Sequence, residues 1–284
     1  MSSAVEQPGG SPDFRVYGIC YAHREPVAAA EVFHHAEPDD CDTAMAYFIW
    51  LITGSAGTFL VDTGFGTTVA RARGRERCLR GDPLDVLRAL GVSPEELPEV
   101  ILTHLHFDHC GELDRFPAAR FWLQRREMAF WTGPSASRRS FRRVVEGADL
   151  TAMVELNLRG RVRWVDGDAD LAPGLSVHHV GGHTDGMQVV RVQTARGVLV
   201  LASDASHYYA NIDADRPYSA VDSVSGAHAA FDRLRELAGP GGHIVPGHDP
   251  EVLARYPAAS PQLSGLAVEV VVGPAGHGNE RETS

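Results

Sequence analysis

The sequence predicts an α/β protein built as one large domain. Hydrophobic content of 44% with 29 Gly and 17 Pro is typical of a loop-rich α/β chain. Apolar runs of strand length recur in both halves, and at least one segment has apolar residues at helical spacing. We expect the domain to cover residues 13–272, between a disordered tail at 1–12 and a polar tail at 273–284.

The first half of the domain is expected to begin with strands near 14–21, 45–53 and 57–62. A helix near 83–90 follows, because Asp82 can cap its first turn and Pro83 suits the first helical position. The next strands are expected near 99–103 and 119–123. Residues 124–160 are predicted to be helical, with a break at Gly133-Pro134-Ser135, and to form an inserted cap.

The second half is expected to contain strands near 161–165, 174–180, 187–194 and 197–202. A helix near 222–238 has Phe231, Leu234 and Leu237 on one face, and it ends at a glycine-rich run from Gly239. The domain is completed by a short strand at 243–245, a helix near 250–256 and a last strand near 264–272.

The residues most informative about function directly follow the apolar run at 100–103; they are His104, His106, Asp108 and His109. Alternate residues of an extended segment share a face, so His104 and His106 can bind one metal ion. Asp108 and His109 fall where the chain turns toward a helix, and there they can face a second ion. Zinc binds His nitrogen and Asp oxygen, and two metal ions about 3.5–4 Å apart form a hydrolytic clamp. The pattern predicts a metal site.

Three further candidate ligands occur downstream, each at the end of a predicted strand. His183 lies in a glycine-flanked turn, Asp204 follows a very apolar run at 197–203, and His248 follows a short strand. A lone His or Asp is weak evidence of function. Their joint placement at strand ends strengthens the prediction of a metal site.

This ordered set resembles the ligand pattern of the metallo-β-lactamase-fold hydrolases, over roughly residues 14–258. Their strand ending in an Asp-Thr-Gly turn is matched at Asp62-Thr63-Gly64. Within that superfamily, the His-Leu-His-Phe-Asp-His run at 104–109 is most similar to the N-acyl homoserine lactone lactonases. The resemblance implies an αββα sandwich of two mixed β-sheets flanked by helices. Periodicity alone indicates only an α/β fold.

The resemblance also implies two metal ions per chain, zinc first, with manganese, cobalt or iron as alternatives for nitrogen and oxygen ligands. The expected ligands of the first ion are His104, His106 and His183, and those of the second are Asp108, His109 and His248. Asp204 is expected to bridge the two ions. Asp62 has no ligand position in the family pattern, and we interpret it as an acceptor for a ligand imidazole N–H.

The implied reaction is the opening of a lactone ring, in an acyl-homoserine lactone or a related lactone, by a metal-bridging hydroxide. Asp108 would carry the proton to the leaving oxygen. The lactonases commonly have a Tyr three residues after the bridging Asp, where this chain has His207, followed by Tyr208. Either His207 or Tyr208 would hold the substrate carbonyl. Phe65 and Phe107 are candidates for an apolar wall of the substrate pocket.

Two other functions remain open. Thioester hydrolases of the glyoxalase II type have the same seven ligands, but they normally bind glutathione through a basic C-terminal region. From residue 255 onward, only Arg255 and Arg281 are cationic. The second alternative is a non-catalytic metal-binding protein of the same fold, which the complete ligand set disfavours.

Composition limits the partners. A net charge of −11 without any Lys argues against a nucleic-acid partner and excludes Schiff-base and P-loop lysine chemistry. The four Cys form no CxxC pair, so neither a disulfide framework nor a thiolate zinc site is indicated. Residues 1–12 lack the apolar core of a signal peptide, and the run at 44–52 is too short to span a bilayer. We expect a cytoplasmic enzyme acting on a small molecule, with a homodimer as one option.

Overall fold

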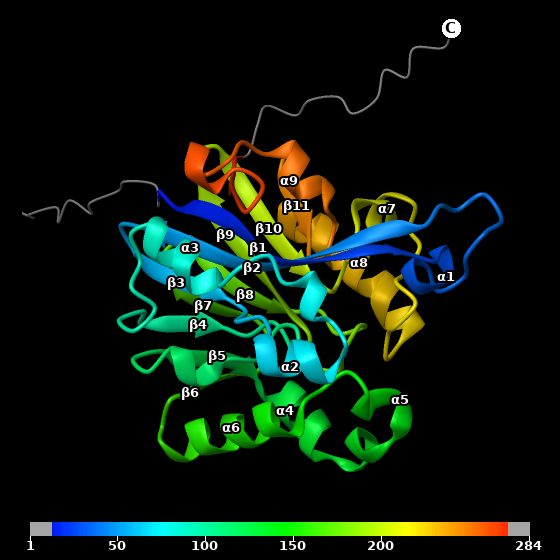
Figure 1. Ribbon diagram of the computed structural model, residues 1–284, viewed down its shortest axis with the longest axis horizontal. Helices are drawn as coiled ribbons and strands as arrows, with labels where there is room; N and C mark the ends of the chain where they lie inside the picture. Colours follow the sequence, from blue (N-terminus) through cyan, green and yellow to red (C-terminus); the bar gives the residue numbers. More distant parts are fainter. Residues whose placement is uncertain (1–12, 272–284) are drawn as a thin grey trace, which may run out of the picture.

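The computed structural model describes residues 13–271. Within this range, two mixed β-sheets pack face to face, and helices lie on the outer side of each sheet (Figure 1). The αββα sandwich expected from the resemblance is therefore confirmed. The tails expected at 1–12 and 273–284 lie outside the described residues.

The first sheet has the strand order β12-β1-β2-β3-β4-β5-β6. The bounds are β1 Arg15–Val27, β2 Thr43–Gly54, β3 Gly57–Val61, β4 Glu99–Ile101, β5 Arg120–Gln124, β6 Val162–Val165 and β12 Ala267–Val270. Strands β3 to β6 run parallel to one another, while β12, β1, β2 and β3 pair antiparallel.

The second sheet has the order β11-β10-β9-β8-β7. The bounds are β7 Ala169–Ala172, β8 Leu175–His179, β9 Gln188–Thr194, β10 Gly197–Ser203 and β11 His243–Pro246. Strands β10 and β11 are parallel, and the other neighbours are antiparallel. Consequently β8, β10 and β11 share one direction, and their carboxyl ends meet at the same edge of the sheet.

The central layer of the fold is an apolar core between the sheets. On β2, Phe48, Trp50 and Ile52 face this layer, together with Val190 and Leu201 from the second sheet. The alternate β2 residues Tyr47, Ile49 and Leu51 belong instead to the core under the helices. Strand β2 is buried on both faces, which explains why its sequence is a continuous apolar run rather than an alternating one.

The helices cover the outer faces of both sheets. Their bounds are α1 Ala29–Val32, α2 Thr67–Ala72, α3 Pro83–Ala89, α4 Arg125–Thr132, α5 Arg139–Arg142, α6 Gly147–Leu158, α7 Tyr209–Asp213, α8 Val224–Ala238 and α9 Glu251–Arg255. Helix α3 begins as expected, since the side chain of Asp82 accepts a hydrogen bond from the N–H of Leu84 at 3.0 Å. Helix α8 ends at Gly239, whose φ is +64°.

The differences from the expected elements have local causes. Strand β1 extends past 21 to Val27, because bulged pairing with β2 continues through a polar stretch that hides the strand in the sequence. Strand β7 and helices α1, α2 and α7 were not expected, and each has only four to six residues, too few to show periodicity. Residues 125–158 are mainly helical, as expected, and their function as a cap stays a prediction.

No helix among residues 13–271 is long and apolar enough to cross a membrane.

Candidate metal centre

The metal-ligand candidates lie in loops at the carboxyl ends of strands from both sheets. The loop after β4 carries His104, His106, Asp108 and His109. In the second sheet, His183 follows β8, Asp204 follows β10 and His248 follows β11. These three strands run in the same direction, so the order of the strands brings their ends to one place.

The structure brings all seven expected ligands into one cluster. One ligand atom each from His104, His106, His183 and Asp204 lies within 4.8 Å of the others, and the same holds for Asp108, His109 and His248. All of these residues except Asp108 are buried, and the side chain of Asp108 is 12% exposed. Apart from Asp204, which falls in the first group, the two groups contain the same residues as the two expected sets of ligands.

Asp204 lies between the two groups. Its Oδ2 is 3.2 Å from Nε2 of His183 and 3.8 Å from Nε2 of His104. Its Oδ1 is 3.1 Å from Nε2 of His109 and 2.9 Å from Nε2 of His248. Each carboxylate oxygen therefore faces a different group of imidazoles, which is the position that a bridging ligand needs.

The hydrogen bonds of two ligands indicate that the cluster is built for a cation. Nδ1 of His109 is 2.8 Å from Oδ2 of Asp62, and Nδ1 of His248 is 2.8 Å from the carbonyl oxygen of Ala46. Both acceptors hold a proton on Nδ1, so in the neutral ring the lone pair lies on Nε2 and points into the cluster. These two Nε2 atoms are 3.3 Å apart. Against the effect of burial, nearby carboxylates, Asp204 first, raise the pKa of both rings, which favours a proton at the place where a metal ion would bind. The residues therefore fit divalent metal ions, which would replace those protons.

Charges within the cluster also suit metal binding. Burial and neighbouring imidazoles hold the pKa of His104 and His106 well below the usual range, so both rings are neutral, the form that binds a metal. Burial by itself would raise the pKa of Asp204, but the surrounding imidazoles, His109 first, keep it well below the usual range. Asp204 is therefore an anion.

A second layer of contacts orients the ligands from the Asp62-Thr63-Gly64 turn. Besides His109, the carboxylate of Asp62 accepts hydrogen bonds from the N–H and hydroxyl of Thr103. The φ of Asp62 is +62° and that of Gly64 is +74°. A Cβ at Gly64 would lie 2.9 Å from the ring of Tyr21, so this position requires glycine. Asp62 is the imidazole acceptor that the sequence suggested.

Glu127 was missed from the sequence, although it fixes both ligand loops. Its fully buried carboxylate accepts hydrogen bonds from the N–H of Leu105, the hydroxyl of Thr184 and the N–H of Gly186, at 2.9, 2.7 and 3.1 Å. It also accepts one from Nε1 of Trp131 at 2.7 Å. In the sequence Glu127 follows two arginines at the start of α4, where it resembles an ordinary surface residue.

The two candidates for holding the substrate carbonyl lie in different environments. Nε2 of His207 is 3.0 Å from Oδ2 of Asp204, and its ring stacks on Tyr218 with centroids 3.5 Å apart. His207, Asp204 and His248 also form a third group with ligand atoms within 4.8 Å of one another. Tyr208 is not brought to the cluster. Its ring is buried in the core under the helices, because α7 begins at the next residue and turns the side chain away.

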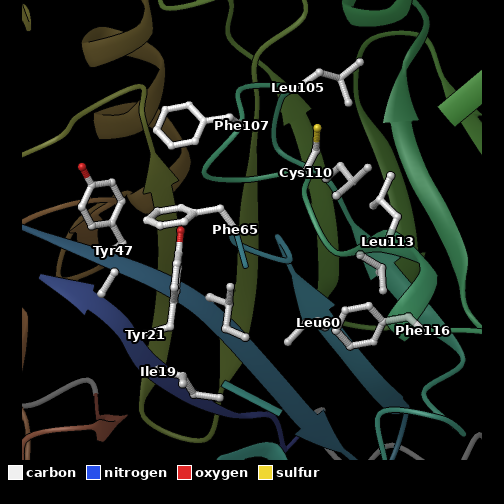
Figure 2. Packing of buried hydrophobic residues seen from close by; sticks show 14 of the residues in the cluster. Ile19, Tyr21, Tyr47, Leu60, Phe65, Leu105, Phe107, Cys110, Leu113 and Phe116 are labelled. Atoms are coloured by element: carbon white, nitrogen blue, oxygen red, sulfur yellow. The ribbon is translucent and has the colours of Figure 1, made fainter. Parts of the chain in front are cut away.

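The cluster of candidate metal ligands opens into a cavity of about 330 Å³. Phe107 lines this cavity, as expected. Phe65 does not: its buried ring packs against Tyr21, Tyr47 and Phe107, with centroids 5.2, 5.5 and 5.4 Å away (Figure 2). The expectation that Phe65 forms a pocket wall was therefore wrong, since Tyr47 and Phe107 separate it from the cavity.

The lining of the cavity has a feature that the amino-acid sequence did not reveal. Four arginines from three separate segments line it, namely Arg24, Arg73, Arg75 and Arg143. Scattered arginines in an Arg-rich, Lys-free chain carry no distinguishing signal. Only the folded structure places these four around one opening.

A family model described as the metallo-beta-lactamase superfamily matches residues 42–272, and the chain belongs to that superfamily. Relatives named N-acyl homoserine lactonase are similar to it. One from Bacillus sp is 29% identical over 201 residues, covering 66% of this chain and 74% of the relative. The N-acyl homoserine lactonase AttM of Azorhizobium caulinodans is 29% identical over 181 residues, covering 61% of this chain and 66% of the relative.

Solved structures agree with the fold. An N-acyl homoserine lactone hydrolase with the product N-hexanoyl-L-homoserine bound at its catalytic metal centre has a TM-score of 0.71 at 21% identity. The match covers 87% of this chain and 97% of that one. The dizinc quorum-quenching lactonase AidC has a TM-score of 0.66 at 18% identity, covering 84% and 92%. At these identities the likeness establishes the fold.

Proposed function

We propose that the protein is a metal-dependent hydrolase that opens the ring of a lactone, an N-acyl homoserine lactone or a related one. The observation that carries the proposal is the position of Asp204, whose two oxygens face two separate imidazole groups at the cavity. The similarity to relatives named N-acyl homoserine lactonase supports lactones as the substrate class.

The proposed ligands of one metal ion are His104, His106 and His183, and those of the second are Asp108, His109 and His248, with Asp204 shared. When bound, the ions supply an acidified water and a Lewis acid for the carbonyl oxygen. Zinc suits this His-rich set, and manganese, cobalt or iron can bind the same nitrogen and oxygen ligands.

The residues of the chain orient the substrate and move a proton. Asp108 has the most exposed side chain of the proposed ligands and lines the cavity. We assign to its carboxylate the transfer of a proton to the ring oxygen that leaves as an alcohol. His207 lines the same cavity and is held in place by its stack on Tyr218. Burial lowers the pKa of His207, so its ring is neutral and carries a single N–H. Its Nε2 faces Asp204, and with metal ions on Asp204 that N–H would be free to donate to the substrate carbonyl.

The C-terminal segment offers little support for a thioester hydrolase of the glyoxalase II type. Within the described residues, Arg255 is the cation of this segment, and its guanidinium is already engaged. It stacks on Tyr209 at 3.6 Å from the ring centroid and pairs with Glu251 at 2.8 Å.

A hydrolysis panel on metal-loaded protein tests the proposal. The panel contains short- and long-chain acyl-homoserine lactones, other γ- and δ-lactones, S-lactoylglutathione, a cephalosporin and a phosphodiester. We expect a lactone to have the highest kcat/KM. A tenfold or larger advantage for S-lactoylglutathione or the phosphodiester over every lactone would refute the lactonase proposal.

A variant of the proposed proton carrier provides a second arm of this test. Asp108→Asn should lower kcat by about 10²-fold or more, in the range of lost general acid–base catalysis. Asp114→Asn is the matched control, because Asp114 follows the same motif and its side chain is exposed. Full activity of Asp108→Asn with its metals bound would contradict the assigned role.

A further inference from the structure

Two of the arginines at the cavity have no carboxylate partner among residues 13–271. Arg24 pairs with Glu31 at 3.1 Å, and Arg73 pairs with Glu146 at 2.6 Å, so those two positive charges are balanced. Arg75 and Arg143 form no ion pair in the described part of the chain. Their charge remains available to a ligand in the cavity.

Arg75 lies close to the metal cluster. Its guanidinium donates a hydrogen bond to the hydroxyl of Tyr47, whose ring meets the edge of the ligand His248 at a centroid distance of 5.2 Å. The guanidinium carbon is also 5.3 Å from the ring centroid of Phe107, which lies between ligands in the sequence. The ring of Tyr47 therefore lies between Arg75 and His248 at the edge of the cluster. Arg75 is half-buried, and its remaining N–H groups can still donate to a ligand.

Arg143 approaches the cavity from the connection between α5 and α6. The backbone there is fixed to the metal loop, because the N–H of Phe107 donates to the carbonyl oxygen of Val144 at 2.9 Å. Arg73 donates to the carbonyl oxygen of Arg143 at 3.0 Å, which fixes the same connection from a second side. These two hydrogen bonds hold the backbone at Arg143 and Val144, whereas the side chain of Arg143 is exposed and lines the cavity.

Although the chain has a net charge of −11, these two guanidinium groups at one opening have no carboxylate partner within residues 13–271. The acids that line the cavity are Glu31, which Arg24 neutralises, and the proposed metal ligands Asp108 and Asp204. With divalent ions on those two carboxylates, no acid lining the cavity is left to balance Arg75 and Arg143. A positive cavity in an acidic protein attracts anions, and each guanidinium fork matches the geometry of a carboxylate.

We propose that Arg75 and Arg143 form a subsite for a carboxylate, so that the preferred substrate is a lactone bearing a carboxylate substituent beside the ring. This inference rests on the proposed lactonase function and makes it more specific. An uncharged ring would leave both arginines unused. A carboxylated ring would place its carbonyl at the metal cluster and its anion at the cavity mouth.

The test uses two γ-lactones that differ only in charge, 5-oxotetrahydrofuran-2-carboxylate and the corresponding carboxamide. Metal-loaded wild-type protein should prefer the carboxylate at least tenfold in kcat/KM. Arg75→Gln and Arg143→Gln should each reduce that ratio at least threefold, mainly through KM, because the contact is present in both ground and transition states. The ratio should also fall with added salt. Arg163→Gln, at an exposed residue of β6, is the matched control and should retain the ratio.

A binding measurement separates this inference from the proposed reaction. Calorimetry compares tetrahydrofuran-2-carboxylate with its carboxamide, neither of which can be hydrolysed as a lactone. Tighter binding of the carboxylate by at least tenfold, lost in Arg143→Gln, supports the subsite even if no lactone is hydrolysed. Equal affinities for the two compounds would overturn the subsite. A preference for the carboxylate that survives both Arg75→Gln and Arg143→Gln would also overturn the subsite, because that result places the anion on the metal ions.

Discussion

Asp62 and His109 lie 47 positions apart in the sequence, and Oδ2 of Asp62 is 2.8 Å from Nδ1 of His109. This contact holds the proton on Nδ1 and leaves Nε2 facing Asp204 at 3.1 Å. The Asp-Thr-Gly turn after β3 therefore determines which nitrogen of a distant residue is presented to the metal cluster.

Replacing the orienting carboxylate should weaken metal binding without removing a ligand. For Asp62→Asn we expect metal affinity to fall about 10- to 100-fold, because an amide holds the His109 tautomer less well. Competition with a chromophoric chelator at neutral pH measures the change. Asp114→Asn, at an exposed residue after the same motif, is the control. Wild-type affinity in Asp62→Asn would contradict the assigned role.

Replacing Asp204, the proposed shared ligand, should weaken the binding of both metal ions. We expect two divalent ions per wild-type chain by elemental analysis, and clearly fewer than two in Asp204→Asn after dialysis. The reason is that both oxygens of Asp204 face imidazole groups, and the anion offsets the repulsion between two dications. Asp114→Asn, at an exposed residue, should retain the wild-type content. One ion or none in metal-supplemented wild-type protein would exclude a dinuclear centre.

Glu127 should stabilise the ligand loops rather than take part in the reaction. Glu127→Ala leaves several buried donors unpaired, so the free energy of unfolding should fall by about 2–4 kcal/mol. Metal affinity should fall with it, and Glu127→Gln should be intermediate, since the amide keeps one acceptor. Urea unfolding with and without metal measures both effects. Glu155→Gln, exposed on α6, is the control, and equal stability of all three variants would argue against this role.

Substitutions at 207 and 208 should show which of the two side chains holds the substrate carbonyl. His207→Ala should lower kcat and kcat/KM together by about 10²-fold, as loss of a transition-state contact does. Tyr208→Phe should stay near wild type, because its ring is buried in the core. Metal content is checked in both variants. A larger loss of activity in Tyr208→Phe would favour Tyr208 instead.

We expect the stability of the protein to depend on pH through Asp149, in the first turn of α6. Burial, together with Glu146 and Glu112, raises the pKa of Asp149 to about 7. A carboxyl whose folded-state pKa is raised stabilises the fold below its unfolded pKa of about 3.9, and this stability is lost as the pH rises through 7. Asp149→Asn should therefore gain about 1 kcal/mol relative to wild type at pH 8 and little at pH 4. Urea unfolding at both pH values measures the difference, and an equal effect at both would contradict the shift.

Much of the fold and of the ligand set could be predicted because the signals are local. The helix from Val224 has its apolar residues at helical spacing. The helix that begins at Pro83 is capped by Asp82, as expected. The pairing of strands into two sheets could not be obtained from periodicity, since β1 pairs with β12 from the opposite end of the chain. Only the family resemblance supplied that architecture.

The aromatic residues show where local signals end. Phe65 and Phe107 are both apolar and both adjoin motif residues, yet only Phe107 lines the cavity. Likewise His207 faces Asp204 while its neighbour Tyr208 turns into the core. Adjacent side chains point in different directions, and the direction depends on how the whole segment docks.

The sequence by itself determined the chemical types of the candidate metal ligands and their positions at strand ends, because each motif is short and contiguous. Tertiary structure alone decided how charges are shared among them. Glu127 is a buried acceptor only because two remote loops meet it. At the cavity, Arg24 and Arg73 have carboxylate partners, whereas Arg75 and Arg143 have none among residues 13–271. Partners for charged groups come from distant segments of the chain, so the balance of charge at a site is a property of the fold.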